Sequence, residues 1–259
     1  MKIGQNDIYL TDTGADKPAL LLVHGIMMDH SVWEHQVSAF ETTHRVVSID
    51  LRGFGASSST SPNITFDDHC DDILEIIDTL GLRNTTLVGW SMGGAIAQVL
   101  AARNENKIQK FVLVDTTPQL IASEAFPHAL PLEAAQQLGK LLAEDFEQGC
   151  AAFCELIAPE DDSVAGQLTK IAARTNIDVA MSAFGSSGGR TQLSILPQIK
   201  TPTAVICGRD DAICLPAANE IMASTIPGCS TGVHWIEDSG HAPFLTKPDQ
   251  FNQVLRSVL

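Results

Sequence analysis

Residues 89–93, G-W-S-M-G, place a serine between two glycines in the pattern G-x-S-x-G. The apolar run 85–88 precedes this motif, and a helical pattern over 94–103 follows it. A serine at such a strand-to-helix turn requires glycine two positions away on each side, because the chain is crowded there. The following helix directs its first amides at charge that develops during attack. Ser91 is therefore the candidate nucleophile, and a purely structural glycine-rich turn is the alternative.

A serine hydroxyl attacks efficiently only when a base accepts its proton, so the motif requires a histidine. His241 lies in the loop S-G-H-A-P-F at 239–244, after the last apolar run, where a side chain can reach over the sheet edge. His234 lies inside an apolar run, and a structural role is its simpler interpretation. His241 is therefore the candidate base, since no distinguishing neighbours surround His30, His35, His44, His69 or His128.

The histidine in turn needs a carboxylate to orient it, and the chain offers three. Asp210 and Asp211 follow the apolar run 203–207, and Asp115 follows the run 111–114. Each of them leaves the carboxyl end of a predicted strand. Residue type and spacing alone therefore leave the choice of acid open.

Negative charge on a substrate oxygen during attack must be stabilised by hydrogen-bond donors. The N–H of Met92, directly after the candidate nucleophile, is one such donor. Gly25 follows the apolar run 19–23 and allows the backbone to turn so that the N–H of Ile26 points inward. We expect the Ile26 and Met92 amides to form the oxyanion hole.

Short apolar runs, separated by helical patterns, are predicted as strands buried on both faces: 19–23, 45–49, 85–88, 111–114, 203–207 and 233–236. The clearest helix, 67–80, has Thr65 as N-cap, aspartates in its first turns and Gly81 at its end. We interpret these aspartates as a solvated helix start and not as a metal site. The predicted fold class is α/β, with a mostly parallel central sheet flanked by helices.

The alternation stops after Asp115, and 118–195 has only helical patterns, such as 130–142 and 148–157. Because this insertion is too long for a loop, we predict a helical cap subdomain at 118–195 on a core domain formed by 1–117 and 196–259. The cap has ten acidic and four basic residues, a net charge of −6, which disfavours an acidic carrier protein as partner. Its Arg174 and Arg190 could meet a substrate carboxylate, although a surface position is the simpler interpretation.

The whole chain of 259 residues has a formal net charge of −15 and is 44% hydrophobic, which is typical of a globular protein with a full core. The negative charge disfavours nucleic acid and anionic membranes as partners. A signal-peptide pattern and a membrane-length apolar run are both missing from the sequence, which predicts a cytoplasmic protein. The six cysteines have no C-x-x-C spacing and are expected to be reduced thiols.

Five motifs, in this order, resemble those of the α/β-hydrolase superfamily, and more narrowly its small cytosolic esterase, lactonase and perhydrolase-like members. They are H-G-I-M-M-D-H-S-V-W at 24–33, D-L-R-G-F-G-A-S at 50–57, G-W-S-M-G-G at 89–94, G-R-D-D at 208–211 and S-G-H-A-P-F at 239–244. The resemblance implies the α/β-hydrolase fold with a helical cap, and the chain order Ser91, acid, His241. In this family the acid usually stands three residues after the glycine of its loop, with a proline soon after. That pattern implies Asp211.

The resemblance also implies a carboxylesterase-like serine hydrolase that forms an acyl-enzyme and needs no metal or organic cofactor. Related enzymes with aspartate as nucleophile, such as haloalkane dehalogenases and epoxide hydrolases, are disfavoured by Ser91. The expected partner is a small-molecule substrate, a neutral ester or lactone, in a pocket under the apolar cap. The alternatives are a cofactor-free perhydrolase or haloperoxidase-like enzyme, a C–C bond hydrolase, and a ligand receptor of the same fold. The oligomeric state is left open.

Overall fold

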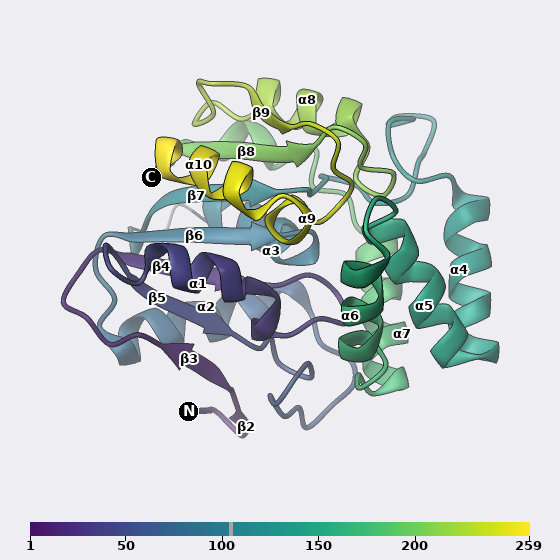
Figure 1. Cartoon of the computed structure of the whole chain (residues 1–259), viewed down its shortest axis with the longest axis horizontal. Helices are drawn as coiled ribbons and strands as arrows, with labels where there is room; N and C mark the ends of the chain where they lie inside the picture. Colours follow the sequence, from purple (N-terminus) through teal and green to yellow (C-terminus); the bar gives the residue numbers. More distant parts are fainter. Residues whose placement is uncertain (104–105) are drawn as a thin grey trace.

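The computed structural model contains one large sheet with the strand order β3-β5-β4-β6-β7-β8-β9 (Figure 1). The structure describes residues 1–103 and 106–259. Its strands are β3 (Leu10–Asp12), β4 (Ala19–Val23), β5 (Arg45–Ile49), β6 (Thr85–Trp90), β7 (Ile108–Val114), β8 (Thr203–Gly208) and β9 (Val233–Ile236). All neighbours in this sheet are parallel except β3 and β5. The predicted mostly parallel sheet is thus confirmed, and β1 (Lys2–Ile3) and β2 (Asn6–Asp7) form a separate antiparallel pair.

The apolar runs become strands because both faces of the sheet are covered. β4 and β8 are buried along their whole length. The bounds of β4, β5 and β9 agree with the prediction, whereas β6, β7 and β8 are longer. β6 continues through Gly89 and Trp90 because Trp90 still pairs with Val114 of β7. The polar motifs of the sequence therefore begin at the carboxyl ends of the central strands.

Helices cover the two faces of the sheet. One face carries α1 (Glu34–Phe40), α9 (Pro243–Thr246) and α10 (Pro248–Val258), and the other carries α2 (Phe66–Leu80), α3 (Met92–Ala102) and α8 (Pro216–Thr225) (Figure 1). Thr65 caps α2 and Gly81 ends it, as predicted. Thr65 and Asp68 also form a reciprocal capping box, and Gly81 is left-handed with φ of 59°. Asp67 and Asp71 pair with Arg103 but keep side chains that are 65% and 72% exposed, as expected for a solvated helix start. Asp72 differs, because it is buried in an ion pair with Arg52.

The long insertion between β7 and β8 folds into four helices within the described residues. They are α4 (Leu132–Glu144), α5 (Phe146–Ile157), α6 (Asp162–Ala172) and α7 (Ile177–Gly188). They gather beyond the carboxyl ends of the parallel strands (Figure 1). The two helices predicted here correspond to α4 and α5 with shifted ends, since Pro131 precedes α4 and the Asp145 side chain caps α5. This arrangement places the helices over the end of the sheet where the candidate site residues lie.

All six cysteines are free thiols, as predicted, and five of them are buried. Within the described residues we find no helix with both the length and the apolarity needed to cross a membrane.

Candidate active site

Ser91 occupies a strained turn between β6 and α3. Its φ of 53° and ψ of −115° lie in a region that residues with a side chain rarely adopt. A Cβ at Gly89 would lie 2.4 Å from the Gly93 carbonyl oxygen, and one at Gly93 would lie 2.5 Å from that of Val23. Both contacts are shorter than atoms allow, so the turn excludes any side chain at these two positions. The crowding expected from the G-x-S-x-G pattern is present.

Neighbouring strands hold this turn through hydrogen bonds to the serine backbone. The Ser91 N–H donates to the Val114 carbonyl at 3.0 Å, and the Thr116 hydroxyl donates to the Ser91 carbonyl at 2.8 Å. Both partners lie at the end of β7 or just after it. Sequence reasoning missed Thr116, because a threonine after a strand gives no signal of such a contact.

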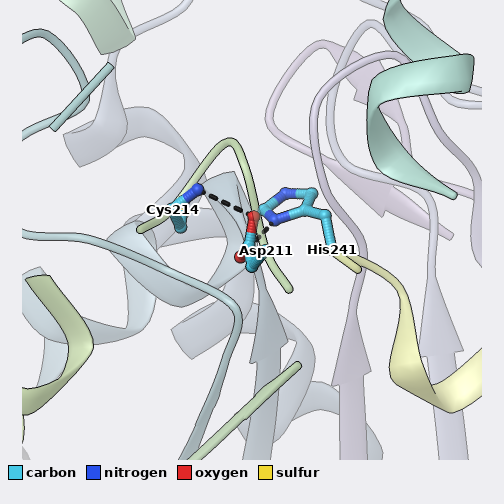
Figure 2. Close-up of side chains that lie close together, drawn as sticks. All are labelled: Asp211, Cys214 and His241. Carbon is cyan, nitrogen blue, oxygen red and sulfur yellow. Dashed lines mark hydrogen bonds and ion pairs between the residues drawn. The ribbon is translucent and has the colours of Figure 1, made fainter. Parts of the chain in front are cut away.

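The side chains of His241 and Asp211 are joined in the core, with exposed fractions of 1% and 2%. His241 Nδ1 lies 2.8 Å from Asp211 Oδ2, and Asp211 Oδ1 accepts the amide of Cys214 at 2.9 Å (Figure 2). Asp211 Oδ1 also accepts the amide of Ile213 at 2.8 Å. Since Nδ1 faces a carboxylate, it is the nitrogen that carries the hydrogen. Nε2 is then left as a proton acceptor.

His241 Nε2 is buried and has no hydrogen-bond partner among the described residues, so the structure does not join it to Ser91. The two loops are nevertheless adjacent. The indole N–H of Trp90, the residue before the serine, donates to the His241 carbonyl at 2.7 Å, and the two rings lie 5.6 Å apart. A serine–histidine hydrogen bond often forms only with substrate in place.

The other two candidate acids lie elsewhere. The Asp210 side chain is exposed, and it makes no hydrogen bond to His241. Asp115 is fully buried, and its Oδ1 accepts the Gly208 amide at 2.8 Å. Burial, together with the nearby Asp211 carboxylate, raises the pKa of Asp115 well above its usual range and so favours its neutral form.

The two amides expected to form the oxyanion hole both lie beside Ser91. Among described groups, neither the Ile26 nor the Met92 N–H has an acceptor. Ile26, Met92 and Ser91 line the same cavity. A Cβ at Gly25 would lie 3.2 Å from the Ser91 Cβ, so glycine lets the loop after β4 approach the serine closely.

This cavity has a volume of about 300 Å³ and lies between the sheet and the inserted helices. Its lining is mostly apolar, and the helices contribute Phe153, Met181 and Phe184. Their position at the cavity shows that these three side chains help to shape a binding space.

The inserted helices also hold the histidine loop. Glu160, between α5 and α6, accepts the Gly240 amide at 2.8 Å, and the Ile157 carbonyl accepts the His241 amide at 2.9 Å. Nothing in the sequence indicates these contacts, because the partners are about 80 residues apart and no feature of the sequence distinguishes Glu160 from the other acidic residues.

Asp211, Cys214 and His241 come close enough to be considered as metal ligands. Burial and the neighbouring carboxyl groups raise the pKa of the Cys214 thiol well above its usual range, so it keeps its proton. Both carboxylate oxygens of Asp211 already accept hydrogen bonds. This chemistry fits a hydrogen-bonded pair and not a metal centre.

The family model for the alpha/beta hydrolase fold matches residues 18–156. A "Putative non-heme chloroperoxidase" of Synechocystis is 31% identical, over 98% of this chain and 95% of that protein. A pimeloyl-[acyl-carrier protein] methyl ester esterase of Nitrosomonas europaea is 28% identical, over 94% and 96%. Among solved structures, a bromoperoxidase from Bacillus anthracis superposes with a TM-score of 0.90 at 26% identity, over 98% of this chain and 95% of that one.

Proposed function

Because this chain belongs to the alpha/beta hydrolase fold family, we propose that it is a serine hydrolase that cleaves small carboxylic esters or lactones through an acyl-enzyme. The observation that carries the proposal is the buried His241–Asp211 pair with a free Nε2, beside the strained Ser91 at a 300 Å³ cavity. Ser91, His241 and Asp211 are the proposed triad.

In the first half-reaction His241 Nε2 takes the proton of the Ser91 hydroxyl while Oγ attacks the ester carbonyl. Asp211 fixes the imidazole through Nδ1 and stabilises the imidazolium that forms. The Ile26 and Met92 amides stabilise the negative oxygen of the tetrahedral intermediate. His241 then gives the proton to the leaving alcohol, and the C–O bond of the ester breaks.

In the second half-reaction water replaces the alcohol. His241 takes a proton from water as it attacks the acyl-enzyme, and returns that proton to Ser91 as the acid leaves. We further propose that residues 118–195 act as a cap on a core of 1–117 and 196–259. The support is the position of α4, α5 and α7 at the cavity wall and the hydrogen bonds of Ile157 and Glu160 to the histidine loop.

A second candidate function is perhydrolysis, in which hydrogen peroxide replaces water and the product is a peroxy acid. It is favoured by the peroxidase names of the Synechocystis relative and the Bacillus anthracis structure. The same three residues would serve, since only the second nucleophile differs.

The test is turnover of p-nitrophenyl acetate and butyrate by the purified protein, with and without hydrogen peroxide. We expect Ser91→Ala and His241→Ala each to lower kcat by roughly 10³-fold or more, whereas the exposed Ser224→Ala leaves it unchanged. Peroxy acid formed faster than free acid would favour the second candidate.

Two results would overturn the proposal. One is Ser91→Ala with full activity. The other is the absence of Ser91-dependent turnover on any short ester or lactone. In that case, a ligand that raises the Tm but undergoes only a single slow turnover would favour a ligand receptor.

A further inference from the structure

The cavity beside Ser91 carries a single formal charge among the described residues that line it, and this charge is positive. It belongs to Arg190, just after α7, whereas the chain as a whole has a net charge of −15. The rest of the lining is mostly apolar, with a few hydroxyl and amide side chains. A lone cation in such a wall attracts an anionic group and repels a cationic one.

Arg190 makes no ion pair within the described part of the chain. Its Nε is buried without a hydrogen-bond partner, and the guanidinium carbon lies 4.7 Å from the centroid of the Phe66 ring. Most other arginines pair with at least one carboxylate; these are Arg45, Arg52, Arg103, Arg174 and Arg209. In a chain with 31 acidic residues, the missing carboxylate at Arg190 is therefore unusual.

A second donor lies on the same wall. Ser187, in the last turn of α7, lines the cavity, and its Oγ is buried without a hydrogen-bond partner among the described residues. Burying a charged or hydroxyl donor without an acceptor is unfavourable. An anionic group of a bound ligand would satisfy both donors, and a guanidinium can donate two parallel hydrogen bonds to one carboxylate.

We propose that the substrate is an ester or lactone with a free carboxylate elsewhere in the molecule, held by Arg190 and Ser187 while its ester group lies at Ser91. This inference rests on the proposed function of Ser91, and it replaces the neutral substrate expected from the sequence. A carboxylate fits better than a phosphate, because one arginine and one hydroxyl supply too few donors for a dianion. The 300 Å³ volume suits a short half-ester of a dicarboxylic acid.

The experiment compares monomethyl esters of dicarboxylic acids from succinate upward with the corresponding dimethyl esters. We expect the parent protein to prefer the half-ester in kcat/KM, and Arg190→Gln to lower the half-ester to diester ratio by roughly 10-fold to 100-fold, mainly through KM. Arg190→Lys retains part of the preference, since lysine keeps the positive charge but lacks the planar guanidinium with its two parallel donors. Ser187→Ala has a smaller effect.

Arg174→Gln is the matched control. This second arginine of the insertion pairs with Asp29 at 2.9 Å, has a side chain that is 67% exposed, and is not part of the cavity lining. Its replacement leaves the ratio unchanged. Inorganic phosphate and succinate, added as competitors, distinguish the two anion chemistries: succinate inhibits, and stronger inhibition by phosphate would overturn the choice of carboxylate.

Binding is also measured without turnover, in Ser91→Ala protein. Monomethyl succinate should raise the Tm of Ser91→Ala and leave that of Ser91→Ala/Arg190→Gln unchanged. If Ser91-dependent turnover is present but Arg190→Gln keeps the half-ester preference, this inference is wrong and the hydrolase proposal stands. If Ser91→Ala retains activity, the hydrolase proposal itself is wrong.

Discussion

Two buried carboxyl groups, Asp115 and Asp211, lie near each other at the ends of β7 and β8, and only Asp211 bonds to His241. Asp115 faces the Gly208 amide, and burial together with the nearby Asp211 carboxylate raises its pKa. The raised pKa favours a neutral Asp115 carboxyl group, which adds no second negative charge beside the proposed triad. The two aspartates should therefore respond very differently to an amide substitution.

We expect Asp211→Asn to lower kcat/KM for p-nitrophenyl butyrate by about 10³-fold or more, because the amide cannot stabilise the imidazolium. Asp115→Asn should cost less than about 10-fold, since a neutral amide oxygen can still accept the Gly208 N–H. Asp210→Asn, at an exposed side chain, is the control and should be neutral. An inactive Asp210→Asn beside an active Asp211→Asn would show that the acid is assigned to the wrong residue.

The sequence could predict the residue types of the site but not all of their contacts. Spacing left Asp115, Asp210 and Asp211 open, and the family pattern selected Asp211, which the structure pairs with His241. Its role stays a prediction until it is measured. The Trp90 and Glu160 contacts with the histidine loop could not be predicted, because they join residues 151 and 80 positions apart. The Glu160 contact also depends on how the inserted helices pack.

At the scale of elements, the junction of β6 and α3 depends on glycine for close packing. The first turn of α3 lies against the end of β4, where a Cβ at Gly93 would lie 2.5 Å from the Val23 oxygen and 2.6 Å from the His24 oxygen. These are backbone atoms of a buried strand and its loop, so they cannot move aside. By contrast, a Cβ at Gly166 in α6 meets no atom within 4 Å.

Gly93→Ala should therefore lower the free energy of unfolding by more than about 2 kcal/mol and also reduce activity, as α3 is pushed from β4. Gly166→Ala should raise it by about 0.5–1 kcal/mol, because alanine favours the helix and no contact is disturbed. Urea unfolding followed by circular dichroism measures both. Equal stability of the Gly93→Ala and parent proteins would contradict the packing argument.

The elements themselves were largely predictable. Continuous apolar runs give β4, β5 and β9 their bounds, and the Thr65 cap and Gly81 stop delimit α2. The errors lie at strand ends and in the insertion. Pairing with β9 extends β8 through Gly208, which is not an apolar residue. The helices α6 and α7 were not predicted individually, because their apolar patterns are short or interrupted by glycine.

At the scale of the whole molecule, the charge of −15 and the charge of the cavity have opposite signs. The acidic residues lie mostly on the surface, many in ion pairs, whereas the cavity lining described here contains only Arg190 as a charged group. Net charge therefore predicts which large partners are repelled, but it does not predict the charge of a small substrate. That property depends on a few residues at the wall of one cavity.

The core also contains a buried histidine whose protonation at low pH is unfavourable for the folded state. His69 of α2 is 3% exposed, and burial, with a smaller effect from nearby His24 and Arg52, lowers its pKa to about 3. In an unfolded chain a histidine titrates near 6.5. Between these two values the unfolded chain binds the extra proton, so the stability contributed by neutral His69 is complete above pH 6.5 and is lost as the pH falls toward 3.

We therefore expect His69→Gln, which cannot titrate, to lose less stability than the parent between pH 7 and pH 5. For a folded pKa of about 3 the difference is about 2 kcal/mol, or roughly 4–8 °C in Tm. Scanning calorimetry at the two pH values measures it. The exposed His35→Gln serves as control and should follow the parent. If His69→Gln shows the same fall in Tm as the parent, His69 is not the group whose protonation destabilises the fold, whatever the absolute Tm at pH 7.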